Sequence, residues 1–205
     1  MKAEEYSLVD AAGKIAIELQ QSQYDSAFAQ LKPLIEQYPK MPFLHYVYGT
    51  ALLSLSEFDE AAAQMRAETA ISPSSALPYL RLASIALREH RPAEAAPWAK
   101  RALELAPESA EAHYLLGRAA LESGDDATAL RELEIASKLN PRSPEVHFNL
   151  AKAYARAKRP EKAEQERATF SQLNEIAERE RSQHGTQIYA GPHDAGQATT
   201  TASPQ

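Results

Sequence analysis

The sequence predicts an all-α fold of tandem helical hairpins, an α-solenoid. Glycine is scarce, at 7 of 205 residues, and residues 14–184 hold only Gly49, Gly117 and Gly124. A β-rich chain would need many more turns of the kind that glycine makes. A spacing of 34 residues also recurs along the chain, in one series of prolines and one of alanines: Pro39, Pro73, Pro107 and Pro141, and Ala27, Ala61, Ala95, Ala129 and Ala163. Such self-similarity is typical of repeat proteins.

Residues 110–143 indicate most clearly what one repeat contains. A first helix is predicted by bulky and small residues recurring at i, i+3, i+4 and i+7: His113, Leu116, Gly117 and Ala120. Gly124 tolerates left-handed backbone and ends this helix, and the two aspartates after it suit the start of a second helix. Pro141 ends the second helix. Small residues such as Ala129 and Gly117 are expected where the two backbones approach closely, and hairpins must stack because one hairpin cannot bury its own apolar face.

The hairpins follow one another directly, so we predict one solenoid over residues 1–182. Its repeats are residues 8–41, 42–75, 76–109, 110–143 and 144–182. The last repeat ends in a long helix with a charged outer side, which we interpret as a cap. Residues 183–205 have Ile188 and Tyr189 as their only large apolar side chains, too few to offset the entropy lost on ordering, so we predict a disordered tail. A short docking segment around these two residues is the alternative.

Several departures from the pattern carry expectations of their own. The first repeat is the weakest, because Lys14 stands where later repeats have a large core residue. Glu68 replaces a small residue, so the second helix of its repeat is expected to pack less closely. Pro33 and Pro97 fall inside second helices, where we expect local kinks.

This pattern resembles the tetratricopeptide repeat family, whose unit of about 34 residues has a bulky residue, Leu-Gly, small and apolar residues and a closing proline at fixed positions. The match in residues 110–143 is residue by residue: His113, Leu116, Gly117, Ala120, Ala129, Leu133, Ala136 and Pro141. The resemblance covers residues 8–182. It implies a right-handed superhelix in which the first helix of each repeat lines a concave face.

In that family the second, fifth, ninth and twelfth positions of each first helix point into a peptide-binding groove. In this chain the second positions include Phe43 and Leu77, and the fifth are Tyr46, Leu80, Tyr114 and Phe148. The ninth positions are Thr50, Ser84, Arg118 and Lys152, and the twelfth include Leu53, Leu87 and Leu121. The resemblance therefore implies an apolar, aromatic groove that gains two cations in its last repeats. The lysine and asparagine clamp with which some family members hold a chaperone's C-terminal carboxylate is absent, so chaperone tails are not expected partners.

No pattern in the sequence indicates an enzyme or a cofactor. Cysteine is absent, which excludes disulfides, thiolate metal sites and cysteine nucleophiles. No glycine-rich phosphate loop, hydrolase elbow or zinc-protease motif occurs. Three histidines share one repeat position: His45, His113 and His147. Packed helices lie about 8–10 Å apart, so these side chains are held too far apart to meet at one metal ion, and we interpret them as packing residues.

Charge and hydropathy limit the partners. The net charge of −6 argues against nucleic acid as a partner, and no apolar run approaches the roughly 20 residues that membrane insertion needs. The amphipathic start does not resemble a signal peptide, so we expect a cytoplasmic location, with an excised piece of an exported protein as the alternative.

We therefore predict a non-enzymatic scaffold that binds an extended or helical segment of a partner protein in its concave groove. Two alternatives stay open. The chain could be a structural subunit that forms a homodimer through its solenoid ends, using Leu8, Ile15 and Leu19 as an open apolar face. It could also be the interaction or regulatory arm of a larger protein.

Overall fold

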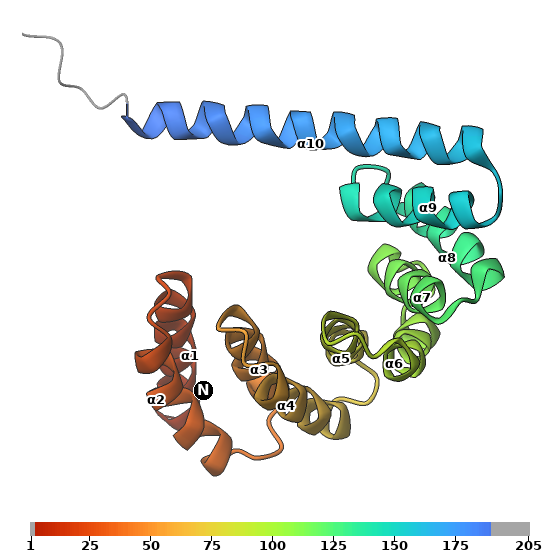
Figure 1. Ribbon diagram of the computed structural model, residues 1–205. Coiled ribbons are helices and arrows are strands. Elements are labelled where there is room, and N and C mark those ends of the chain that lie inside the picture. Colours follow the sequence, from red (N-terminus) through yellow and green to blue (C-terminus); the bar gives the residue numbers. More distant parts are fainter. Residues whose placement is uncertain (1–2, 190–205) are drawn as a thin grey trace, which may run out of the picture. The chain divides into compact units, whose positions relative to one another are not determined.

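The computed structural model describes the backbone of residues 3–189 and the side chains of residues 11–182. Within that span the chain is all-α, as predicted, and no strand occurs among the described residues. Figure 1 shows the helices following one another in pairs. Their bounds are α1 (Ala3–Gln20), α2 (Tyr24–Gln37), α3 (Leu44–Ser54), α4 (Phe58–Ile71), α5 (Ala76–Arg88), α6 (Pro92–Leu105), α7 (Ala110–Ser123), α8 (Asp126–Leu139), α9 (Pro144–Arg156) and α10 (Pro160–Tyr189).

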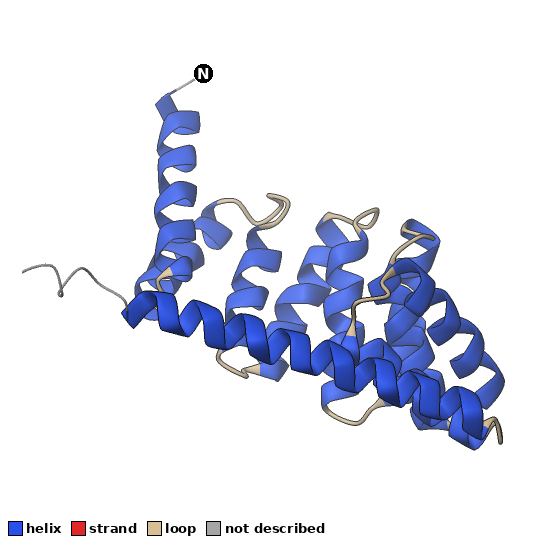
Figure 2. Cartoon of the chain, turned by 90° about the horizontal axis from the view of Figure 1, so that it is seen from above, coloured by secondary structure: helices blue, strands red, loops and turns tan. Residues whose placement is uncertain are grey.

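The chain divides into two compact units, Met1–Pro141 and Arg142–Gln205. The first unit holds the hairpins from α1 to α8. In it, α1, α3, α5 and α7 lie along the inner side of a curved row, and α2, α4, α6 and α8 lie along the outer side (Figure 1). Short loops join successive helices at their ends (Figure 2). The second unit is the hairpin of α9 and α10.

Each hairpin turns through a residue in the left-handed backbone conformation. These residues also recur every 34 positions: Ser22 (φ 59°), Ser56 (φ 63°), His90 (φ 56°), Gly124 (φ 87°) and Lys158 (φ 57°). Gly124 ends α7, as predicted. At the other four turns an L-residue adopts a conformation that disfavours it by about 1–2 kcal/mol. The hairpin geometry therefore dictates this backbone, and only one of the five turns has the residue that suits it.

Glycine at two of these turns is expected to stabilise the first unit. Ser56→Gly and His90→Gly should each add about 0.5–1 kcal/mol, because relief of the left-handed strain exceeds the extra entropy that glycine gives the unfolded chain. Urea denaturation followed by circular dichroism measures this. Ser74→Gly, in a turn without positive φ, is the matched control and should instead destabilise by about 0.5–1 kcal/mol. Equal changes in all three variants would contradict the strain argument.

Side chains cap the helices of the best-matching repeat. The Ser109 hydroxyl accepts a hydrogen bond from the Ala112 backbone N–H (3.2 Å), and the Asp125 carboxylate accepts one from the Thr128 backbone N–H (3.1 Å). Hydrogen bonds from Thr128 hold the pKa of Asp125 below its ordinary value. A lowered carboxyl pKa means that this cap stabilises α8 at neutral pH, and that its contribution is lost as the pH falls through the lowered pKa.

Small residues allow the two helices of a hairpin to approach closely. Ala129 is fully buried, and a Cβ placed on Gly117 would lie 2.8 Å from Cγ of Leu133 and 3.1 Å from its backbone nitrogen. The predicted close approach at Gly117 and Ala129 is therefore confirmed. Both helices with an internal proline, α2 with Pro33 and α6 with Pro97, continue through it.

The last helix extends further than predicted. We expected it to end near residue 182 and the chain to be disordered from residue 183, but α10 runs to Tyr189. Gly185 alone weakens a helix by only about 1 kcal/mol relative to alanine. The first strong stop signal is the pair Gly191-Pro192, which lies beyond the end of α10. The predicted disorder of residues 190–205 lies outside the described residues.

Candidate peptide-binding groove

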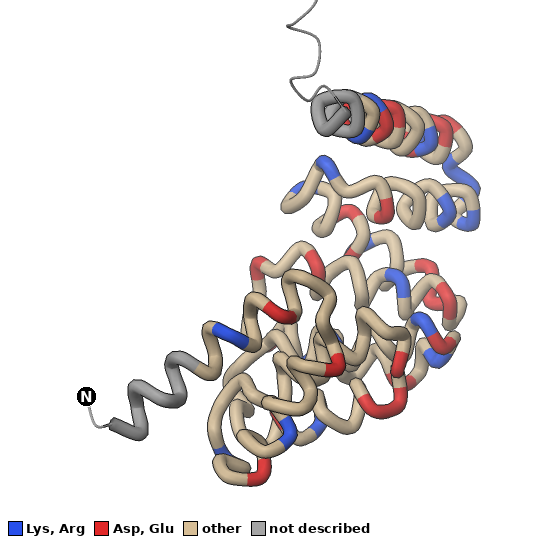
Figure 3. Tube along the Cα trace, turned by 90° about the vertical axis from the view of Figure 1, so that its left-hand side faces the viewer, with Lys and Arg blue, Asp and Glu red and all other residues tan. Residues whose placement is uncertain are grey.

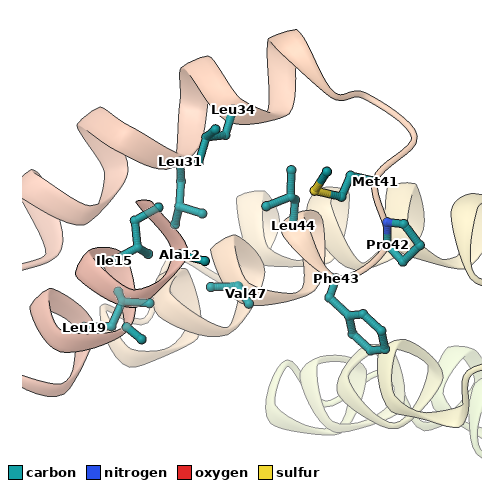
Figure 4. Close-up of a pocket in the computed structure, with 11 residues that line it drawn as sticks. Ala12, Ile15, Leu19, Leu31, Leu34, Met41, Pro42, Phe43, Leu44 and Val47 are labelled. Atoms are coloured by element: carbon teal, nitrogen blue, oxygen red, sulfur yellow. The ribbon is translucent and has the colours of Figure 1, made fainter. Parts of the chain in front are cut away.

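An apolar cavity of about 550 Å³ opens between α1, α2 and α3 in the first unit. Each of the three helices contributes large apolar side chains to its wall: Ile15 and Leu19, Leu31 and Leu34, and Leu44 and Val47. Figure 4 shows these six side chains gathered around one space, with the ring of Phe43 directed away from it. Ala12 and Ala16 of α1 and the segment from Met41 to Phe43 complete the lining. Its size and composition are those of a ligand-binding pocket.

A second, smaller cavity continues from the first along α1 and α3. It has a volume of about 210 Å³ and shares Leu19 and Val47 with its neighbour. Two of the residues predicted for the groove, Tyr46 and Thr50, line it. The Thr50 hydroxyl donates to the carbonyl oxygen of Tyr46 (2.8 Å) within α3. We call the two cavities together the α1–α3 groove.

The α1–α3 groove is also free of charged side chains. None of the residues that line either cavity is acidic or basic. In the first unit the basic and acidic positions are interspersed along the helices (Figure 3). The larger cavity is therefore wholly apolar, and the smaller one has uncharged hydroxyl side chains, those of Tyr24, Tyr46, Thr50 and Ser54.

The groove exists because α1 presents a different face from the first helices of later repeats. At the position where Tyr48 is buried in α3, α1 has the exposed Lys14, and its neighbour Ile15 is buried instead, at 3% exposure. A shift of one residue turns a helix face by about 100°. The turned face buries the Glu18 carboxylate, which accepts a hydrogen bond from the Ser26 hydroxyl (2.8 Å). It also leaves the small side chains of Ala12 and Ala16 lining the larger cavity.

The start of α3 is held by a buried carboxylate from α4. Glu68 is 1% exposed; its Oε1 accepts from the Phe43 backbone N–H (2.9 Å) and its Oε2 from the Tyr46 backbone N–H (3.3 Å). The Ser72 hydroxyl also donates to Oε1 (2.7 Å). The later first helices follow a serine, whereas α3 follows Phe43 in a left-handed conformation (φ 72°). Glu68, expected to loosen its repeat, therefore supplies the missing cap.

The predicted groove residues differ in their exposure. Exposed are Phe43, Thr50, Leu77, Phe148 and Lys152; half-buried are Tyr46, Leu53, Ser84, Tyr114 and Arg118; buried are Leu80, Leu87 and Leu121. All of them except Phe148 and Lys152 belong to the first unit.

For three leucines the predicted groove position is wrong. Leu80, Leu87 and Leu121 are 5%, 0% and 3% exposed, and none of them lines either cavity of the α1–α3 groove. Leu80 and Leu87 belong to the core cluster that joins α5 with α7. These two first helices contact each other directly, and the fifth and twelfth positions of α5 are used for stacking.

The two predicted cations are placed differently. Arg118 donates through Nη2 to the carbonyl oxygen of Leu87 (3.2 Å) and through Nε to Glu122 (2.8 Å), so it joins α7 to the end of α5. Lys152, in the second unit, lies with Nζ 5.2 Å from the centre of the Phe148 ring. Arg118 is thus already engaged within the fold, and Lys152 is the exposed cation of the pair.

The histidines pack within their own hairpins, as interpreted. Each bulky first-helix residue meets the residue 19 positions later: His45 with Gln64 (2.6 Å), Tyr79 with Trp98 (ring centres 6.0 Å apart), His113 with Glu132 (2.7 Å) and His147 with Glu166 (2.6 Å). Within the described part of the chain, no three His, Asp or Glu side chains converge as a metal site would require.

The face proposed for self-association is not open at Ile15. This residue packs into the core of the first hairpins, and Leu19 is half-buried. The side chain of Leu8 lies outside the described residues. Ile15 and Leu19, which the alternative of self-association placed on an open face at a solenoid end, line the α1–α3 groove. The mismatch at Lys14 is the sequence signal that α1 differs from the later first helices.

Comparison with known proteins agrees with the fold. Family models described as tetratricopeptide repeat match residues 17–76, 86–147 and 120–169. No curated protein matches the chain. A solved structure of MamA from Desulfovibrio magneticus RS-1 is similar, with a TM-score of 0.73 and 20% identity over 81% of this chain and 94% of that one. YrrB, described as a TPR protein with an unusual peptide-binding site, gives a TM-score of 0.69 and 16% identity over 84% of this chain and 92% of that one. None of the helices among the described residues has the length and apolar run needed to cross a membrane.

Proposed function

Since this chain belongs to the tetratricopeptide repeat family, we propose that it is a non-enzymatic interaction module that binds a segment of another protein along the first helices of its repeats. The α1–α3 groove is the observation that carries this proposal. It is concave and apolar, it opens between α1, α2 and α3 of the first unit, and it includes Tyr46 and Thr50 of the predicted set.

Exposed apolar side chains at the starts of α3 and α5 support the same role. Phe43 is 51% exposed and Leu77, at the same position of the following repeat, is 40% exposed. Large apolar groups clustered on a surface are a common sign of an interaction site. In the second unit, Phe148 is 46% exposed and packs against Phe170, and with Lys152 it would contact the partner independently.

The expected affinity is moderate. A segment that buries about 400 Å² of apolar surface gains roughly 10 kcal/mol at about 25 cal/mol per Å². Association and side-chain ordering oppose this by about 4 kcal/mol or more. The remainder corresponds to roughly micromolar binding, which suits a reversible scaffold.

The test is to remove the exposed apolar groups at the starts of α3 and α5. The double variant Phe43→Ser/Leu77→Ser should lose proteins captured from extracts of the source cell, and its affinity for the purified partner should fall at least tenfold. Isothermal titration of that partner against the wild-type chain and the variant measures the change.

A matched control is available in the same chain. Leu55 and Leu139 are each 43% exposed and lie outside the predicted groove, so Leu55→Ser/Leu139→Ser should keep the partner. Circular dichroism checks that both variants retain their helices. If both double variants bind equally well, the proposed surface is wrong.

A further inference from the structure

The polarity of the α1–α3 groove indicates the conformation of the segment that fits it. We infer that the groove takes an amphipathic helix of a partner protein, entering with an uncharged apolar face. This inference rests on the proposed function and goes beyond it, because the repeat pattern alone leaves extended and helical segments equally open.

The main argument concerns backbone hydrogen bonds. The larger cavity is lined only by alanine, isoleucine, leucine, methionine, proline, phenylalanine and valine, so no side chain in it can pair with a peptide's backbone. An extended segment buried there would leave N–H and C=O groups unpaired, which is strongly unfavourable. A helix pairs its own backbone groups and presents only side chains. Helix-in-groove binding is an established mode of peptide recognition, in which apolar anchors recur at i, i+3, i+4 and i+7.

The dimensions of the groove agree with a short helix. On α1 the lining runs from Ala12 to Leu19, and on α3 from Leu44 to Ser54. At about 1.5 Å per residue these stretches are about 10 and 15 Å long. Two to three turns of a partner helix span that length. The missing charge in the lining requires that the buried face carry neither acidic nor basic residues.

A second copy of the chain fits the groove less well. The large apolar side chains that are exposed among residues 11–182 are Ile17, Phe43, Leu55, Leu77, Leu139, Phe148 and Ile176. No two of them share one helix, so within residues 11–182 no helix offers a row of fully exposed large anchors. The occupant is therefore expected to be a segment of a different protein.

The test uses two uncharged, fluorescein-labelled peptides of identical composition with the full chain. In the first peptide, leucines recur at i, i+3, i+4 and i+7 among glutamine, alanine and serine; in the second, the same residues are reordered so that leucines alternate as in a strand. Fluorescence anisotropy should give micromolar binding of the first peptide and at least tenfold weaker binding of the second. Absence of binding, or equal binding of both peptides, would overturn the inference.

Variants locate the binding site. Ala16 lines the groove and is exposed, so Ala16→Glu should place a carboxylate in the groove without disturbing the core and weaken binding of the helical peptide at least tenfold. Ala29→Glu, on an exposed part of α2 outside the lining, is the matched control and should change the affinity less than twofold. Ala12→Glu replaces Ala16→Glu if the latter loses helicity. Wild-type affinity in the groove variant would overturn the inference.

Other occupants give different results. A wild-type dimer in sedimentation that Ala16→Glu dissociates would show that a second copy fills the groove. Tighter peptide binding by Ile188→Ser/Tyr189→Ser would show that the chain's own segment competes. Both results overturn the inference. If neither peptide binds while the captured partner still depends on Phe43 and Leu77, this inference fails and the proposed function stands.

Discussion

Replacing Glu68 with alanine is expected to destabilise the first unit by about 3 kcal/mol. The buried carboxylate accepts hydrogen bonds from the backbone N–H groups of Phe43 and Tyr46 and from the Ser72 hydroxyl. Hydrogen bonds to a charged group contribute about 1.5–3 kcal/mol each, and donors left buried without a partner are unfavourable. Glu68→Gln keeps the volume and one acceptor oxygen, so it should lose about half as much.

The repeat pattern alone gives the opposite expectation, that alanine at position 68 stabilises the chain, so the measured stability of Glu68→Ala distinguishes the two. Alanine stands at the equivalent positions of the next two repeats, Ala102 and Ala136, and substitutions toward a repeat consensus often stabilise. If Glu68→Ala is as stable as the wild-type chain in urea denaturation, the capping role is wrong. Glu60→Ala, an exposed change in the same helix, is the control and should shift stability by less than about 1 kcal/mol. Faster hydrogen exchange at the Tyr46 amide in Glu68→Ala would locate the effect at the start of α3.

The repeat pattern was sufficient to predict the helical hairpins, for a physical reason. A unit that recurs every 34 residues must place equivalent residues in equivalent surroundings, so one well-matched copy predicts the others. The left-handed turn at Gly124 and the close approach at Gly117 followed from that copy. Where a copy departs from the pattern, as at Lys14 or Glu68, the sequence shows that the local packing differs. It does not show which face of the helix is buried instead, or which hydrogen bonds replace the usual packing.

The exposure of the groove residues was harder to predict, because it depends on how closely neighbouring repeats stack. Phe43 and Leu77 remain exposed, whereas Leu80 and Leu87 are buried where α5 contacts α7. These residues are all large and apolar, so residue type does not distinguish them. The residues of α1 and α2 that line the cavity were missed because a hydrophobic residue in a poorly matching repeat is equally compatible with the core.

The strongest packing prediction concerns the pair Gly117 and Leu133. Leu133→Ala is expected to cost about 3 kcal/mol, because this side chain is fully buried and its loss leaves a cavity. Gly117→Ala is expected to cost about 1–2 kcal/mol even though alanine favours a helix, because its Cβ would lie 2.8 Å from Leu133 Cγ and 3.1 Å from its backbone nitrogen.

The chain contains its own evidence that these two costs are coupled. In the preceding repeat the equivalent residues are Ala83 and Ala99, both fully buried, so alanine is accommodated at the first position where the facing residue is also small. The double variant Gly117→Ala/Leu133→Ala recreates that pair, and the new methyl group then occupies part of the vacated space. It should therefore be more stable than the sum of the single changes predicts, by about 1–2 kcal/mol in a double-mutant cycle of urea denaturation. Strict additivity would mean that the contact between Gly117 and Leu133 does not limit how closely α7 and α8 pack.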